Sequence, residues 1–222
     1  MGSTASNVKR RLRTVDRILE RTYGPSPPPT RRDPLDVLIG TILSQNTTDV
    51  NSGRAYEAMR RAFPTWRDVM QASRPRLEKA LRPGGLAKTK SARIQRILRA
   101  IADEGPLDLG YLRKLTSEEV ERRLLAFDGV GLKTARCVLL FGLGRDAFPV
   151  DTHIRRILIR LGIVKPDVTA DQIHASVPAL IPKGRCYPFH VHLIAHGRQT
   201  CRPRKPSCST CPLRRHCPSA EV

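Results

Sequence analysis

Four of the six cysteines are gathered near the end of the chain, in the pattern Cys201-x6-Cys208-x2-Cys211-x5-Cys217. Where thiols stay reduced, a cluster this tight indicates a metal centre more than disulfides. Zinc ribbons use two CxxC pairs, and here only Cys208 and Cys211 form such a pair. The pattern favours a [4Fe-4S] cluster held by four thiolates, with zinc and an inert or disulfide-linked group as the alternatives. Cys137 and Cys186 lie in apolar helical contexts and are expected to be core residues.

Two glycines separate two helical stretches within residues 124–138, which read LLAFDGVGLKTARCV. Glycine adopts backbone angles that other residues avoid, and it lets phosphates approach the main chain closely. The second helix is expected to begin near Leu132, where its first N–H groups could bind phosphate. A simple turn between two helices would contain the same glycines. The basic composition favours contact with a DNA backbone through Gly129, Val130 and Gly131.

A lysine and a carboxylate follow this hairpin. Lys133 lies just inside the second helix, and Asp151 occurs eighteen residues later in the sequence VDTH. A lysine amine can bind phosphate, or it can attack carbon when burial or neighbouring positive charge lowers its pKa from about 10.4. Asp151 suits the N-cap of a helix, and a carboxylate there could also stabilise positive charge on a sugar or move a proton.

The charge of the chain indicates the class of its partner. Lys and Arg number 40 against 20 Asp and Glu, a formal net charge of +20, and cations of this density bind phosphates by releasing condensed counterions. The 40% hydrophobic content is enough for a folded core, which excludes disordered proteins. The sequence shows no apolar run of membrane-helix length and no secretory signal. We therefore expect a cytoplasmic, bacterial nucleoid-associated monomer that binds nucleic acid and no membrane.

The elements that position these residues are predicted to be helices. Apolar residues recur at helical spacing along almost the whole chain, and no segment has a convincing strand pattern. A proline or a capping threonine marks several helix starts, at Pro34, Thr48, Thr116, Thr152 and Thr169. The prolines of residues 24–34 predict a stiff connector after a first amphipathic helix. The fold class is therefore predicted to be all-α.

Several of these motifs occur together in one known family. FDGVGLKTA, PVDTHIRRILIRLG, HGRQTC and the four cysteines, in this order, resemble the endonuclease III-type DNA glycosylases of the helix-hairpin-helix superfamily. The resemblance covers residues 8–217. It implies a six-helix barrel with the hairpin over residues 24–135, and a second helical lobe with the [4Fe-4S] cluster over residues 1–23 and 136–222. Double-stranded DNA would bind in a cleft between the lobes, with the damaged nucleotide flipped into it.

The resemblance also implies a reaction, that of a bifunctional glycosylase and AP lyase acting on oxidised pyrimidines and abasic sites in base excision repair. Lys133 matches the nucleophile and Asp151 the catalytic carboxylate. Lys133 would attack the anomeric carbon, the base would leave, and β-elimination from the Schiff base would nick the strand. Residues 44–49 and 85–88 would fill the hole left by the flipped base. The implied DNA contacts are Gln45, Asn46, Leu86, Gly129, Val130, Gly131 and Thr134.

Three positions depart from the family pattern. Asn46 replaces the gap-filling glutamine, with Gln45 beside it, so contacts to the opposite base are expected to change. Ala87 replaces an aromatic residue after Leu86 and removes stacking support. Asp128 replaces a proline, which is expected to make the hairpin less rigid and to bring a negative charge near the phosphates.

Other activities fit parts of the same pattern. A mismatch-specific adenine glycosylase would carry a catalytic glutamate in the helix before residues 44–49, and residues 34–43 contain none. Thymine mismatch enzymes of the superfamily are harder to separate. A DNA-binding protein without enzymatic activity would use the hairpin, the charge and the cysteines, but it would not require Lys133 and Asp151 together.

The cysteine segment is itself basic, with five Arg and Lys residues between or beside the cysteines. We expect the cluster to be mainly architectural, holding this basic loop against DNA. Three histidines precede the segment on one helical stretch, and they are expected to make structural hydrogen bonds: His190, His192 and His196.

Overall fold

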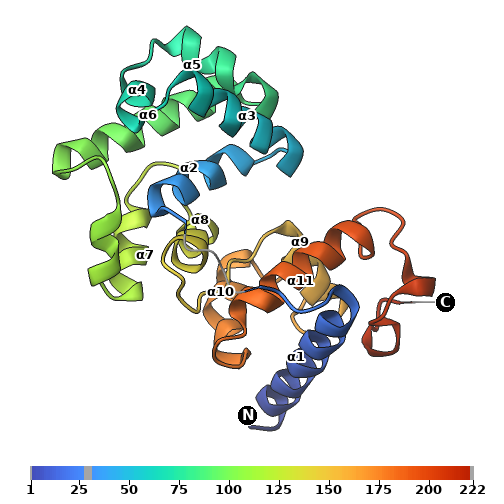
Figure 1. Cartoon of the computed structure of the whole chain (residues 1–222). Coiled ribbons are helices and arrows are strands. Elements are labelled where there is room, and N and C mark those ends of the chain that lie inside the picture. Colours follow the sequence, from blue (N-terminus) through green and yellow to red (C-terminus); the bar gives the residue numbers. More distant parts are fainter. Residues whose placement is uncertain (1, 28–31, 221–222) are drawn as a thin grey trace. The chain divides into compact units, whose positions relative to one another are not determined.

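The computed structural model describes residues 2–27 and 32–220, and the chain forms two compact units (Figure 1). One unit covers Arg31–Arg145, and the other combines Met1–Thr30 with Asp146–Val222. Within the described residues every regular element is a helix, which confirms the all-α prediction. Residues 28–31 of the expected connector lie outside the described part. No described helix is long and apolar enough to cross a bilayer.

The unit Arg31–Arg145 is built around one apolar helix, α2. Its sequence, PLDVLIGTILS, is buried along most of its length, and α3, α6 and α8 pack against it. The helices of this unit are α2 (Pro34–Ser44), α3 (Asp49–Ala62), α4 (Trp66–Gln71), α5 (Arg74–Leu81), η1 (Arg82–Gly84), α6 (Ala87–Glu104), η2 (Gly110–Lys114), α7 (Ser117–Leu125), α8 (Leu132–Cys137) and the π-helical η3 (Val138–Gly142). The long helix α6 carries α4 and α5 on its side (Figure 1).

The first unit extends further along the chain than the sequence boundary near residue 135. The cause is α8, which continues directly into η3 without a turn. η3 packs against α2, where a Cβ on Gly142 would come within 3.0 Å of the Pro34 Cα atom. Arg145 then donates hydrogen bonds to the carbonyl oxygens of Leu112 and Leu115. These contacts keep the segment up to Arg145 within the unit.

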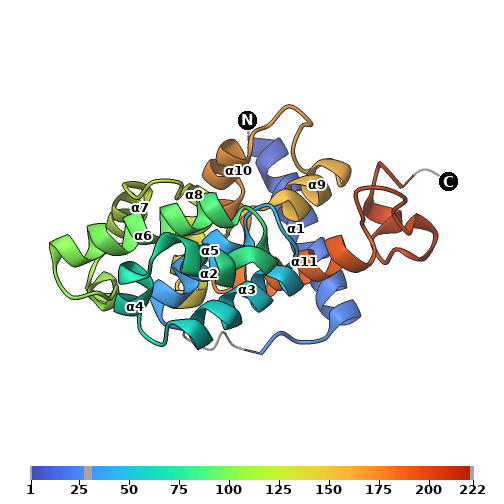
Figure 2. The same cartoon turned by 90° about the horizontal axis from the view of Figure 1, so that it is seen from above.

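The second unit has α1 and α11 side by side, with α9 against α11 (Figure 2). Its helices are α1 (Gly2–Tyr23), α9 (Thr152–Arg160), α10 (Ala170–Ser176), η4 (Pro178–Leu180), α11 (Cys186–Gln199), η5 (Cys208–Thr210) and η6 (Arg214–His216). The Arg185 guanidinium, at the N-cap of α11, donates to both carboxylate oxygens of Asp16 at 2.8 and 2.9 Å and to Glu20 at 2.9 Å. These two carboxylates raise the pKa of Arg185 above its ordinary value.

Most of the predicted helix starts are confirmed. Pro34 begins α2, and the side chains of Thr48, Thr116 and Thr169 cap α3, α7 and α10. The prediction that Thr152 is a cap is wrong. Thr152 is the first residue of α9, because Asp151 occupies the N-cap and its carboxylate accepts a hydrogen bond from the Ile154 amide at 2.8 Å. Both residue types favour this position, and the earlier one takes it.

Candidate functional site

The hairpin between α7 and α8 uses its two glycines differently. Gly129 has a positive φ of +72°, a backbone conformation that favours glycine. Gly131 has an ordinary φ of −102° and is the N-cap of α8, where no side chain caps the first amide groups. Val130 between them is 6% exposed and anchors the turn in the core. Of the two glycines, Gly129 is therefore the one that adopts a backbone conformation other residues avoid.

Lys133 and Thr134 lie in the first turn of α8. Lys133 is half-buried, directly after the hairpin. Thr134 is 3% exposed, so its expected contact with DNA would have to come from its backbone amide, which is among the first N–H groups of the helix. The DNA contact itself stays a prediction for this residue.

The loop after α2 places two polar side chains in different surroundings. The Gln45 side chain is partly buried, and its Oε1 atom accepts a hydrogen bond from Arg93 Nη1 at 2.9 Å. Its Nε2 atom donates to the carbonyl oxygen of Gly129 at 3.3 Å. Asn46 is exposed and has a left-handed φ of 52°. Non-glycine residues rarely adopt this conformation, and such strain is common at functional loops.

The turn before α6 has a second strained residue at its tip. Leu86 has a φ of 49° and is 54% exposed, although it is a large apolar residue. Gly84, two residues earlier, is buried, and a Cβ there would come within 2.9 Å of Ala55 Cβ. An exposed leucine on a strained tip is consistent with a side chain that inserts into a ligand.

Lys90 connects the loop after α2, which carries the Asn46 tip, with the turn before α6, which carries the Leu86 tip. Sequence reasoning missed this residue. Its Nζ atom donates to the carbonyl oxygens of Leu43 and Gly84, each at 2.8 Å, and the residue is 2% exposed. Burial lowers the pKa of this amine. A signal was present in the sequence, because Lys90 lies on the same helical stripe as the buried Ile94 and Ile97.

Asp128 does not leave an unpaired negative charge on the hairpin. Its carboxylate binds Arg96 Nη2 at 2.5 Å and lies 4.0 Å from Arg93 Nε. Both arginines are on α6, and sequence reasoning assigned them no role. Asp128 was expected to bring a negative charge near the phosphates; its side chain is exposed, its charge is paired with arginines of α6, and its effect on phosphate binding stays a prediction.

Asp151 belongs to the other unit, in a short segment held by two buried histidines. The amide of Val150 donates to His174 Nε2 at 2.8 Å, and His190 Nδ1 lies 3.0 Å from the carbonyl oxygen of Pro149. The carboxylate of Asp151 is partly buried and already accepts the α9 capping bond. The two histidine hydrogen bonds thus hold the backbone that precedes Asp151 in place.

The structural role expected for the other two histidines is also observed. His192 Nε2 lies 2.9 Å from the carbonyl oxygen of Gly24 and 3.0 Å from Ser26 Oγ. His196 Nδ1 lies 3.0 Å from the phenol oxygen of Tyr23. These hydrogen bonds join α11 to α1 and the residues that follow it.

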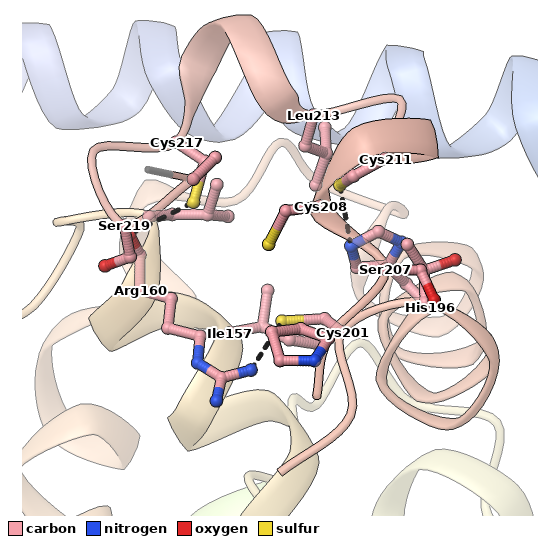
Figure 3. Close-up of a pocket in the computed structure, with 14 residues that line it drawn as sticks. Ile157, Arg160, His196, Cys201, Ser207, Cys208, Cys211, Leu213, Cys217 and Ser219 are labelled. Atoms are coloured by element: carbon pink, nitrogen blue, oxygen red, sulfur yellow. Dashed lines mark hydrogen bonds between the residues drawn. The ribbon is translucent and has the colours of Figure 1, made fainter. Parts of the chain in front are cut away.

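The four clustered cysteines line one cavity of about 160 Å³ in the second unit (Figure 3). Among the described residues no disulfide joins them, and no group of three or more His, Cys, Asp or Glu residues is arranged as a site for a metal ion. Burial raises the pKa values of the Cys211 and Cys217 thiols. Arg160 Nη1 lies 3.3 Å from Cys201 Sγ. His196 Nε2 lies 3.8 Å from Cys211 Sγ, and burial lowers the pKa of this imidazole to about 4.

Known proteins share this sequence and fold. Residues 39–183 match the HhH-GPD superfamily of base excision DNA repair proteins. The chain belongs to that superfamily. A protein of Arabidopsis thaliana with the provisional name DNA glycosylase is 39% identical over 189 residues, which are 85% of this chain and 62% of the plant protein. Endonuclease III of Thermotoga maritima is 33% identical over 185 residues, 83% of each chain.

Solved structures extend the similarity to nearly the whole fold. A non-covalent endonuclease III–DNA complex has a TM-score of 0.81 at 26% identity, covering 96% of both chains. A trapped covalent endonuclease III–DNA intermediate gives the same values. A thermostable thymine-DNA glycosylase, at 22% identity and a TM-score of 0.78, shares the fold.

Within this HhH-GPD protein, several of the predicted site residues come together in one unit. Gln45 contacts the hairpin at Gly129, and Lys90 ties the carbonyl groups that precede the Asn46 and Leu86 tips. Cys137 and Cys186 are buried, as expected for core residues. The four cluster cysteines and Asp151 lie in the other unit.

Proposed function

We propose that this protein is a bifunctional DNA glycosylase and AP lyase that removes oxidised pyrimidines from duplex DNA. The Lys133 amine attacks C1′ of the damaged nucleotide, and the bond from C1′ to the base breaks. The C1′–O4′ bond then breaks and O4′ takes a proton, so the sugar ring opens and an iminium joins Lys133 to C1′. This iminium loses a proton from C2′, and the bond to the 3′ phosphate breaks by β-elimination. Water then releases the lysine. Asp151 stabilises the positive charge that develops on the sugar and moves protons.

One observation carries this proposal. Lys133 is half-buried in the first turn of α8, immediately after a hairpin in which Gly129 has a positive φ, a conformation that favours glycine. A lysine at this place is beside any phosphate that the hairpin binds, so its amine is near the sugar of the same strand. The likeness to the trapped covalent endonuclease III complex supports the same chemistry.

The flipping part of the proposal assigns a role to the two strained tips. Asn46 and Leu86 are exposed residues with left-handed backbones, at φ values of 52° and 49°. We assign Asn46 to the gap left by the flipped nucleotide and Leu86 to the wedge that separates the neighbouring bases. Unstacking a base costs a few kcal/mol, which insertion of such side chains offsets.

We also propose that the cysteine cavity holds a [4Fe-4S] cluster. The four cysteines that line it supply an all-sulfur ligand set of the kind that such clusters require. Raised thiol pKa values at Cys211 and Cys217 mean that thiolates there need compensating positive charge, which bound iron supplies. Arg160 directs an N–H group at Cys201 Sγ, and the Nε2 atom of His196 lies 3.8 Å from Cys211 Sγ (Figure 3). When bound, the cluster would cross-link residues 201–217.

The experiment is borohydride trapping of the purified protein on duplexes that contain thymine glycol or an abasic site. Reduction of the iminium forms a stable covalent protein–DNA adduct, which is resolved by gel electrophoresis. Lys133→Gln removes the amine, and Lys79→Gln, an exposed lysine on α5 of the same unit, is the matched control.

The outcomes separate the candidate functions. We expect adducts on both duplexes, with wild-type yield in Lys79→Gln and none in Lys133→Gln. Adducts on the abasic site alone would mean an AP lyase without the proposed glycosylase activity. Absence of adducts with the wild-type protein, despite DNA binding, would refute the lysine mechanism. Excision of mismatched thymine in place of oxidised pyrimidines would refute the proposed substrate class.

A further inference from the structure

Both polar atoms of the Gln45 side-chain amide are hydrogen-bonded, one to Arg93 on α6 and the other to Gly129 in the hairpin. Oε1 accepts from Arg93 Nη1 at 2.9 Å, and Nε2 donates to the Gly129 carbonyl oxygen at 3.3 Å. A guanidinium can only donate hydrogen bonds and a carbonyl oxygen can only accept them, so the orientation of the amide is fixed. A carboxylate, an amine or an apolar side chain would satisfy at most one of these partners.

Arg93 is in turn held in place by the hairpin. It is 23% exposed along its side chain, and its Nε atom lies 4.0 Å from Asp128 Oδ2. That Nε atom is buried and has no hydrogen-bond acceptor among the described residues. A Cβ on Gly129 would collide with the Arg93 side chain, so the arginine lies directly against the turn. Asp128 is fixed from the other side by Arg96, at 2.5 Å.

These contacts join segments that are far apart in the sequence. The Gln45–Arg93 bond spans 48 residues, and the Gln45–Gly129 bond spans 84. The residue that follows Gln45 is the exposed, left-handed Asn46. On the other side of the loop, Lys90 fixes the carbonyl oxygen of Leu43. The Gln45 side chain therefore anchors the strained tip to the hairpin.

We propose that Gln45 is a positioning residue that couples the Asn46 tip to the hairpin through Arg93 and Gly129, and that it is not itself a DNA contact. This inference rests on the proposed function, since a gap-filling tip has a role only in an enzyme that flips nucleotides. Binding of the hairpin to the DNA backbone and insertion of Asn46 then occur with the two segments in one fixed arrangement. The Gln45 prediction made from the sequence, a direct contact with DNA, is replaced by an indirect role.

A double-mutant cycle tests this coupling, with Gln45→Met and Arg93→Met singly and together. Methionine keeps the length of both side chains and removes their hydrogen bonds. Affinity is measured for a duplex with a tetrahydrofuran abasic analogue and for an undamaged duplex, over a range of salt concentrations. Gln71→Met, an exposed glutamine at the end of α4, is the matched control. Circular dichroism verifies that each variant is folded.

If Gln45 acts through Arg93, each single variant binds the abasic duplex about tenfold more weakly than the wild type. The double variant then loses no more affinity than the single variant with the larger loss. The slope of log affinity against log salt stays unchanged in all of them, because no phosphate contact is removed. Losses that multiply in the double variant would overturn the proposal, since they would mean two independent contacts with DNA. A shallower salt slope in Arg93→Met would also overturn it, by making Arg93 a phosphate ligand.

A second measurement does not depend on affinity. Fluorescence of 2-aminopurine opposite the abasic analogue reports insertion of the tip at saturating protein. We expect the insertion signal to fall in Gln45→Met and to stay at the wild-type level in Gln71→Met, and an unchanged signal in Gln45→Met would refute the coupling. Neither measurement uses the lysine chemistry. Failed trapping would therefore count against the proposed function, and an additive cycle would count against the coupling.

Discussion

Replacing Lys90 by methionine tests whether one buried amine holds both tips. The change removes the donor of two hydrogen bonds, each 2.8 Å long, and leaves the carbonyl oxygens of Leu43 and Gly84 without that partner. A buried polar group that loses its partner costs about 1–3 kcal/mol, so the two carbonyls together cost about 2–6 kcal/mol. The variant also removes a buried amine, and relief from its desolvation offsets part of this loss.

The net effect expected at neutral pH is a decrease of about 2 kcal/mol in the free energy of unfolding. For a chain of this length, that corresponds to a decrease of about 4–8 °C in Tm. Thermal unfolding followed by circular dichroism measures the difference. Lys88→Met, an exposed lysine two residues earlier on α6, is the control and should leave Tm unchanged within about 1 °C.

The pH dependence of the same difference has a defined sign. Burial holds the pKa of Lys90 below its ordinary value in the folded state. Between that lowered pKa and about 10.4, the unfolded chain binds the additional proton, so stability of the wild-type protein rises with pH relative to Lys90→Met. A neutral amine still has two N–H groups for the two carbonyl oxygens.

Two results would refute this reasoning. A Lys90→Met variant as stable as the wild type at pH 7 would mean that the hydrogen bonds contribute no more than the burial of the amine costs. A stability difference that shrinks as the pH rises toward 10 would contradict the direction of the pKa shift.

Three further changes have defined outcomes. Gly129→Ala should lower Tm and weaken binding to undamaged duplex, because the residue has a φ of +72° and a Cβ would displace Arg93; unaltered Tm and binding would contradict this. Asp151→Asn should keep the α9 cap and leave the free energy of unfolding within about 1 kcal/mol of the wild type, while slowing excision in single-turnover assays by about a hundredfold or more; wild-type excision would exclude a catalytic carboxylate. Cys208→Ser should abolish the visible absorbance expected of the proposed [4Fe-4S] cluster and weaken DNA affinity; a folded variant with full DNA affinity would refute the proposed architectural role.

Local sequence patterns were sufficient for most of the fold. Helix starts at Pro34, Thr48, Thr116 and Thr169 depend on a residue and its next few neighbours, and all four are observed. The error at Thr152 is a shift of one position between two good capping residues. The boundary near residue 135 could not be found locally, since α8 continues into η3 through packing against α2.

The sequence predicted that the four cysteines share one site. It could not predict hydrogen bonds between residues that are far apart in the chain. The four cysteines line one cavity, as their spacing led us to expect of a shared site. Gln45 was assigned to DNA from its neighbourhood in the sequence, yet its observed partners, Arg93 and Gly129, lie 48 and 84 residues away. No local pattern encodes such contacts, because they depend on how α6 packs within the unit.

The departures at residues 45–46 and 128 are best understood together. A proline at position 128 would fix φ and stiffen the turn by itself. Asp128 lacks that restraint, and its carboxylate is instead held by Arg96 at 2.5 Å, with Arg93 at 4.0 Å. Exposed ion pairs of this kind contribute about 0–1 kcal/mol, so they restrain the turn weakly unless another group acts with them. Gln45 is that group, because it binds both Arg93 and the Gly129 carbonyl oxygen. The conformation of this hairpin is therefore restrained by side chains of α6 and of the Asn46 loop. A proline at position 128 would have restrained the turn through its own ring.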